Sequence, residues 1–61
     1  MKGKWKVTSN PINGKTMYAV YRLIDINAVD HSGNREYAGG WVHNRETVAI
    51  VAEELNKRQE E

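Results

Sequence analysis

The 61-residue chain contains no cysteine, no phenylalanine and a single proline. Without cysteine, neither a disulfide cross-link nor a thiolate metal site can form. No apolar run approaches the roughly 20 residues that a membrane-spanning helix needs, and no signal-peptide pattern opens the chain. A chain this short buries only about 60% of the surface that its unfolded state exposes. We therefore expect one small domain over residues 1–61, located in the cytoplasm and without a membrane partner.

Residue patterns that would indicate catalysis are also scarce. The sequence has no cysteine nucleophile, no Gly-x-Ser-x-Gly elbow and no phosphate-binding loop. Asp30-His31 could suggest a metal or a base, but a third ligand at a metal-binding spacing is missing, and turn residues such as Asp30 more simply bond nearby amides. The sequence predicts a protein that is not an enzyme and that has no metal, no cofactor and no small-molecule substrate.

Charge is unevenly distributed, although the formal net charge is only +1. Residues 1–22 contain five cations and no acid, residues 23–43 contain three acids against one cation, and residues 44–61 contain five acids against three cations. Such asymmetry can mark an anionic partner. Lysines on an edge strand also deter aggregation, so this distribution alone leaves both interpretations open.

Hydrophobic periodicity predicts two strands in the first half of the chain. In residues 4–9, Trp5, Val7 and Ser9 point one way and Lys4, Lys6 and Thr8 the other, which is typical of a half-buried strand with a solvated lysine face. Asn10-Pro11 is expected to end that strand, and Asn13-Gly14 predicts a two-residue hairpin turn. Residues 15–25 are partly apolar on both faces, which predicts the central strand of the sheet.

The second half of the chain predicts a loop, a third strand and a helix. Residues 35–42 form the third strand, in which Gly39-Gly40 indicates a bulge or a close approach of another backbone. Asn44 is the expected N-cap of a helix over residues 45–58. The apolar residues of this helix recur on one stripe, which is made of Val48, Val51, Ala52 and Leu55.

These elements predict an α+β fold, with a three-stranded antiparallel sheet in strand-strand-strand-helix order and one C-terminal helix packed on one sheet face. The other face of the sheet is then bare. We expect Tyr18, Val20 and Arg22, which alternate along the central strand, to lie on this open face. Trp5 and Trp41 are expected in the core, because a domain of this size needs large residues to close it.

Two functions fit such a domain. The first is a non-enzymatic interaction module that uses the open face and can self-associate, because small domains often gain stability by oligomerising. Its candidate interface residues are Tyr18, Val20 and Ile50, the last on the far side of the helix from the apolar stripe. The alternative is a module that binds duplex DNA with the basic N-terminal hairpin and the open face. Its candidate residues are Lys4, Lys6, Lys15, Tyr18, Arg22 and Arg35.

Two resemblances bear on these functions. Residues 18–22, residues 29–37, the glycine-rich strand and the Ala-Glu-Glu-Leu-Asn run at 52–56 resemble short uncharacterised proteins of Gram-positive bacteria and their phages. That resemblance implies a stand-alone domain and no activity. More weakly, residues 17–55, with Gly39-Gly40-Trp41 and then Glu46 at the helix start, are similar in pattern to the arm-type DNA-binding domain of tyrosine recombinases. This second resemblance implies that the open sheet face enters the DNA major groove.

Overall fold

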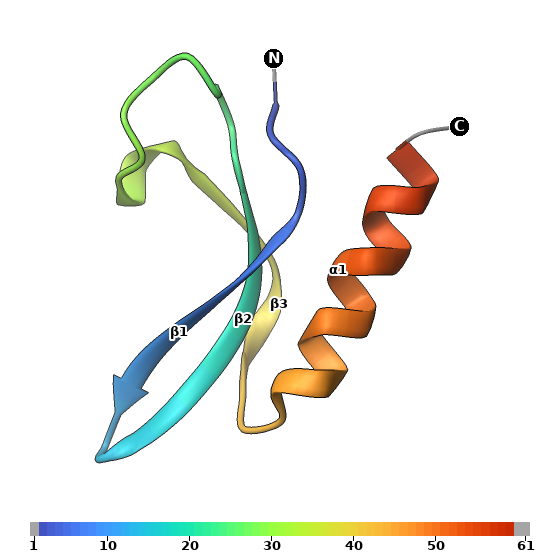
Figure 1. Cartoon of the computed structure of the whole chain (residues 1–61). Coiled ribbons are helices and arrows are strands. Elements are labelled where there is room, and N and C mark those ends of the chain that lie inside the picture. The colour runs from blue at the N-terminus through green and yellow to red at the C-terminus, as the bar shows by residue number, and fades with distance from the viewer. Residues whose placement is uncertain (1, 60–61) are drawn as a thin grey trace.

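The computed structural model describes residues 2–59, which form three strands and a C-terminal helix (Figure 1). The strands are β1 (Lys6–Ile12), β2 (Lys15–Leu23) and β3 (Arg35–Val42), and the helix is α1 (Arg45–Gln59). A short 3-10 turn, Ser32–Asn34, precedes β3. The sheet is antiparallel in the order β1-β2-β3. The predicted α+β fold is thus confirmed, with β2 as the central strand.

A tight hairpin joins β1 to β2. Asn13 and Gly14 have φ values of 52° and 80°, and two positive values in succession are typical of the hairpin turn whose twist matches the strands. The prediction that Asn10-Pro11 ends the first strand is wrong, because Pro11 pairs with Thr16 and β1 continues to Ile12. β1 is an edge strand, where proline is tolerated because its missing N–H can face solvent.

A bulge at Gly39-Gly40 lengthens β3 relative to β2. Gly39 has φ +82°, in the left-handed region that side chains other than glycine rarely adopt. Between the paired positions on either side of the bulge, β3 has two more residues than β2. Because the insertion is an even number, odd-numbered residues of β3 point to the same sheet face before and after the bulge. Tyr37 and Trp41 consequently share one face. The register on either side of the bulge pairs Val20 with Ala38 and Tyr18 with Val42.

Substitutions at the two bulge glycines should separate backbone strain from packing. A Cβ atom added at either Gly39 or Gly40 would meet no heavy atom within 4 Å, but only Gly39 has a positive φ. We expect Gly39→Ala to lower the free energy of unfolding by about 1–2 kcal/mol, and Gly40→Ala to leave it nearly unchanged. Urea denaturation measures both. Equal effects of the two variants would contradict this account of the bulge.

Side-chain amides fix both ends of α1. Asn44 Oδ1 accepts hydrogen bonds from the backbone N–H groups of Glu46 at 2.9 Å and Thr47 at 3.3 Å, which confirms the predicted N-cap. Asn56, near the other end, accepts from the backbone N–H of Trp5 at 2.8 Å and donates to its carbonyl at 3.1 Å. This second pair of bonds attaches the helix to the segment that leads into β1.

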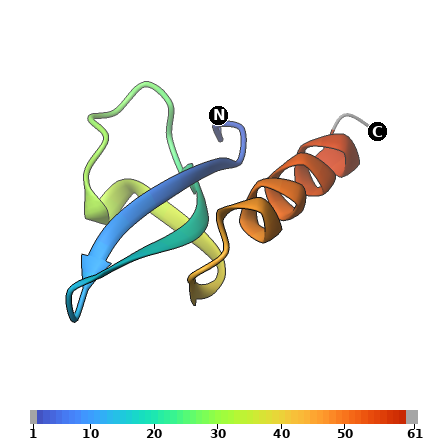
Figure 2. The same ribbon diagram turned by 60° about the horizontal axis from the view of Figure 1, so that its bottom comes forward.

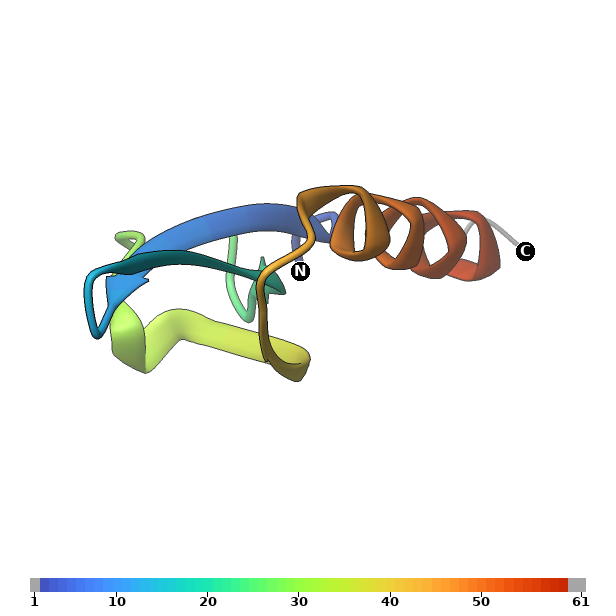
Figure 3. The ribbon, with the colours of Figure 1, turned by 90° about the horizontal axis from the view of Figure 1, so that it is seen from below.

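The core lies where α1 covers β1 and β2. Val20, Val48 and Ala52 are buried there, and α1 makes few contacts with β3 (Figures 2 and 3). Val51, predicted within the packed stripe, is 39% exposed because the helix does not extend over β3. No helix among residues 2–59 has the length and apolarity needed to cross a bilayer. The residues that complete the core are Trp5, Val7, Tyr18, Ala38 and Leu55.

Candidate binding face

One row of side chains crosses all three strands on the face turned away from α1. The register pairs Lys6 with Tyr21 and Tyr21 with Tyr37. Because side chains alternate along a strand, this row lies on the opposite face from Val20, which is in the core beneath the helix. The open face therefore carries a cation on β1 and a tyrosine on each of β2 and β3.

Three aromatic rings line this face, and we call Tyr21, Tyr37 and Trp41 the aromatic stripe. The ring centroids of Tyr21 and Tyr37 are 6.1 Å apart, and those of Tyr37 and Trp41 are 5.9 Å apart. Interplanar angles of 36° and 46° place the rings in tilted contact, an arrangement that aromatic quadrupoles favour over face-to-face stacking. Tyr37 is 42% exposed and Tyr21 only 8%, so Tyr37 offers the ring that a ligand can reach, and Tyr21 supports it from below.

Arg35 and Asp30 border the aromatic stripe. The Arg35 guanidinium carbon lies 4.3 Å from the Tyr21 ring centroid, and Arg35 Nε donates a hydrogen bond to Asp30 Oδ1 at 2.8 Å. This hydrogen bond holds the pKa of Asp30 below its usual 3.8 and raises the pKa of Arg35. Arg35 is thus a fixed cation over the face, partly compensated by one carboxylate.

Three exposed lysines complete this surface. Lys6 and Lys15 alternate onto the open face, and Lys4 lies beside Lys6 at a hollow of about 410 Å³ whose apolar lining includes Leu23 and Ile26. Within residues 2–59, no ion pair engages any of the three. We call this surface the basic–aromatic face; it consists of Lys4, Lys6, Lys15, Tyr21, Arg35, Tyr37 and Trp41.

The structure corrects the predicted membership of the open face. Tyr18 and Val20 pack in the core beneath α1, where Val20 is 1% exposed. Arg22 shares their face: its side chain is 14% exposed, and its guanidinium carbon lies 4.4 Å from the Trp5 ring centroid. The expectation that these three residues face away from the helix is wrong, because β2 has two partly apolar faces and α1 covers the one that contains Val20.

The tryptophans also occupy different surroundings. Trp5 packs against the core, as predicted. Trp41 is half-buried on the open face, next to Tyr37, so its predicted place in the core is wrong. Sequence reasoning also missed Tyr21 and Tyr37 as candidate binding residues. Tyr21 and Tyr37 lie on the same sheet face as Lys6. The sequence could have identified them as binding residues only if it had also shown which sheet face the helix covers.

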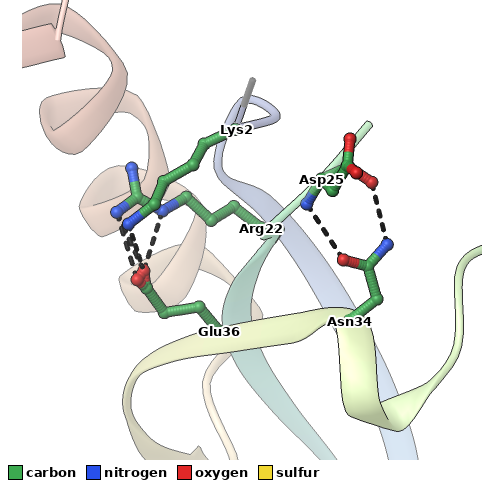
Figure 4. A network of polar contacts seen from close by, with 5 residues as sticks. All are labelled: Lys2, Arg22, Asp25, Asn34 and Glu36. Atoms are coloured by element: carbon green, nitrogen blue, oxygen red, sulfur yellow. Dashed lines mark hydrogen bonds and ion pairs between the residues drawn. The ribbon is translucent and has the colours of Figure 1, made fainter. Parts of the chain in front are cut away.

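On the helix side, Glu36 joins two basic side chains (Figure 4). Arg22 binds both of its carboxylate oxygens, with the shortest contact at 2.8 Å, and Lys2 Nζ lies 3.5 Å from Oε1. The hydrogen bonds from Arg22 are the main reason that the pKa of Glu36 lies below its usual 4.5. Arg22 is therefore engaged away from the basic–aromatic face, whereas Lys2 pairs with Glu36 and also lines the hollow beside Lys4 and Lys6.

The lowered pKa of Glu36 predicts a loss of stability in acid. A carboxylate whose pKa is depressed by folding stabilises the native state above its unfolded pKa, and this contribution disappears as pH falls through the folded value. We expect the unfolding temperature to fall as pH drops below about 4.5, and to fall less steeply in Glu36→Gln. Glu53→Gln, on the solvated surface of α1, serves as the control. An unchanged pH profile in Glu36→Gln would contradict the prediction.

The loop before β3 is held by Asn34, which is 7% exposed (Figure 4). Its Oδ1 accepts from the Asp25 N–H at 2.9 Å, and its Nδ2 donates to the carbonyls of Asp25 at 2.9 Å and Val29 at 3.2 Å. This loop carries Asp30 beside Arg35, so Asn34 positions one border of the basic–aromatic face. Asn34 stands at the end of a run of turn-forming residues, 30–34, and directly before a strand. That position was the only sequence signal for its role in holding the loop.

A second surface feature lies between α1 and β3. Because the helix leans over β1 and β2, an open apolar groove of about 380 Å³ remains beside the bulge. Val42 and Val51 on its walls are 38% and 39% exposed. Ile50 is 60% exposed, and its role in an interface stays a prediction. The groove is lined by Val20, Ala38, Gly39, Gly40, Val42, Thr47, Val48, Val51 and Leu55.

The histidine that the sequence singled out has a local role. His31 Nδ1 accepts a hydrogen bond from the Gly33 N–H at 3.0 Å and so caps the short 3-10 turn. In the part of the chain that the structure describes, no three His, Cys, Asp or Glu residues gather as metal ligands would.

The sheet and helix together define a small α+β domain with one open face that is both basic and aromatic. Comparisons with known protein families, with curated proteins and with solved structures each find no match. The functional argument below therefore rests on the chemistry of this face.

Proposed function

We propose that this protein is a non-enzymatic interaction module that binds nucleic acid through its basic–aromatic face. The observation that carries the proposal is the row of Lys6, Tyr21 and Tyr37 across the sheet, extended along β3 by Trp41. Neighbouring strands lie about 4.8 Å apart, so the lysine and the outer tyrosine are separated by about 10 Å. Across that distance, the lysine can contact a phosphate while the tyrosine contacts a base of the same ligand.

The distribution of charge supports an anionic ligand at this face. Phosphate contacts supply much of the affinity of nucleic-acid binding, and the four cations of the face are opposed at its border by the single carboxylate of Asp30. The acids Glu53 and Glu54 lie on α1, on the other side of the sheet, where Lys57 pairs with both. A net charge of +1 for the whole chain therefore conceals a basic face.

Charge-matched variants test this proposal. Lys4→Gln/Lys6→Gln and Lys57→Gln/Arg58→Gln each remove two cations, from the basic–aromatic face and from α1 respectively. We expect the first variant to weaken binding of a short oligonucleotide and to reduce the slope of log affinity against log salt by about 2. The helix variant should bind like the wild type. Fluorescence anisotropy at low salt and at about 150 mM measures both.

Two results would contradict nucleic-acid binding. If the two double variants weaken binding equally, the protein responds only to its net charge and the face has no special role. If no oligonucleotide binds at about 150 mM salt, where exposed charges are screened beyond about 8 Å, the face has another partner. An amide NMR titration of the wild type would then show no shifts at Lys6, Tyr21 and Tyr37.

Self-association is a second candidate function, favoured by the groove between α1 and β3. Its walls are apolar, and β3 is an edge strand whose outer side pairs with no strand of the described sheet. A second copy could cover both features. Sedimentation equilibrium on the same samples distinguishes the two candidates, because self-association predicts a mass that rises above 7.0 kDa with protein concentration and without any oligonucleotide.

A further inference from the structure

We infer that the nucleic acid is an unpaired strand whose bases stack on Tyr37 and Trp41. This inference rests on the proposed function, and it narrows the ligand from nucleic acid in general to one form. The two features that carry it are the exposure of Tyr37 and the fixed position of Arg35.

The aromatic stripe offers ring surface to a ligand. Tyr37 lies between Tyr21 and Trp41, with centroids about 6 Å from each, so neighbouring side chains hold its ring in place. Its 42% exposure leaves part of that ring in solvent. Bases of any sequence have π faces, and aromatic side chains on sheets bind unpaired strands by stacking with them.

Pairing within a duplex would prevent this contact. A base in a duplex is stacked on its neighbours, so its face is reached only when the strand is unpaired or the base is flipped out. Reading of a duplex depends instead on side chains that hydrogen-bond to base edges, chiefly arginine, lysine, asparagine and glutamine. The arginine of this face, Arg35, is bonded to Asp30 at 2.8 Å and lies over the Tyr21 ring. The face thus presents the exposed ring of Tyr37 to an unpaired base, beside lysines that can contact the phosphates.

The lysines of the face supply charge for the phosphates of the strand. Between these lysines and the aromatic stripe, Ala19 is 1% exposed, and Thr8 and Asn10 of β1 alternate onto the same face. The polar side chains of Thr8 and Asn10 can contact either sugar, so the inference is to an unpaired strand of either nucleic acid.

Two substitutions of Tyr37 test the stacking contact. Tyr37→Leu removes the ring, and Tyr37→Phe retains it without the hydroxyl. We expect Tyr37→Leu to weaken binding of a short oligothymidylate by roughly 5- to 150-fold, and Tyr37→Phe to bind like the wild type. Circular dichroism checks that both variants are folded, and the exposure of Tyr37 makes retention of the fold the expected result.

The wild-type protein provides a measurement that depends on no variant. In an NMR titration with oligothymidylate, the indole N–H signal of Trp41 should shift, whereas that of Trp5, which packs against the core on the opposite face, should not. We also expect oligothymidylate to bind more tightly than a duplex of the same length.

The outcomes separate this inference from the proposed function. Absence of binding to every oligonucleotide would overturn both. Tighter binding of the duplex, with Tyr37→Leu equal to the wild type, would overturn the stacked strand and leave nucleic-acid binding intact. Equal shifts of the Trp41 and Trp5 indole signals would show that the bases do not bind specifically at the aromatic stripe.

Discussion

Replacing Asn34 by alanine is expected to lower the free energy of unfolding by about 3 kcal/mol. The buried carboxamide makes three hydrogen bonds to the backbone, two with Asp25 and one with Val29. Alanine would leave one N–H and two carbonyl groups of the loop without these partners, and the net loss of each hydrogen bond costs about 1 kcal/mol. Urea denaturation followed by tryptophan fluorescence measures the change.

Asn27→Ala is the matched control for Asn34→Ala, because the same substitution is made in the same loop at an exposed position. We expect it to change stability by less than about 0.5 kcal/mol. If Asn34→Ala were no more destabilising than Asn27→Ala, the carboxamide would not be holding the loop. Amide signals of Asp30 and Arg35 should shift in Asn34→Ala, because the loop places these two residues together.

Val20→Ala is the second substitution with a large expected effect. Val20 is 1% exposed and contacts α1 through the core that it shares with Val48 and Ala52. The loss of two buried methyl groups, together with the cavity that they leave, predicts a decrease of about 2 kcal/mol in the free energy of unfolding. A domain of this length has only about 3–9 kcal/mol in total, so the midpoint of denaturation should shift markedly.

The control for Val20→Ala is Val29→Ala. Val29 is 76% exposed, so the same atoms are removed without opening a cavity, and we expect almost no change. Similar effects at the two positions would contradict the placement of Val20 in the core and would support the original expectation that Val20 lies on the open face. Denaturation curves of both variants, measured under the same conditions, decide between the two placements.

Stability and the proposed binding function depend on different residues. Asn34 and Val20 are buried, whereas Tyr37, Lys4 and Lys6 are exposed. Substitutions on the basic–aromatic face should therefore change affinity more than stability. Because the total stability of the domain is small, a binding variant that also unfolded the protein would be uninformative. The binding experiments avoid this, since they alter exposed residues.

Local sequence signals correctly predicted the elements whose cause is also local. Asn13-Gly14 specified the hairpin because both residues tolerate positive φ. Asn44 specified the start of α1 because its side chain accepts hydrogen bonds from the first helical N–H groups. The end of β1 was predicted wrongly at Pro11. A proline lacks an N–H, and this interrupts a strand only where a neighbouring strand would accept from that N–H, which local sequence does not show.

The sequence by itself determined the order of the elements, the hairpin and the helix cap, because each depends on side-chain and backbone properties within a few residues. Only the tertiary structure decided which face of β2 binds the helix. Tyr18, Val20 and Arg22 on one face and Ala19, Tyr21 and Leu23 on the other are both partly apolar, so alternation alone could not choose between them. Contacts of α1 with Val20 and with the backbone of Trp5, more than 25 residues away along the chain, make that choice, and they leave the face that carries Tyr37 and Trp41 uncovered by the helix.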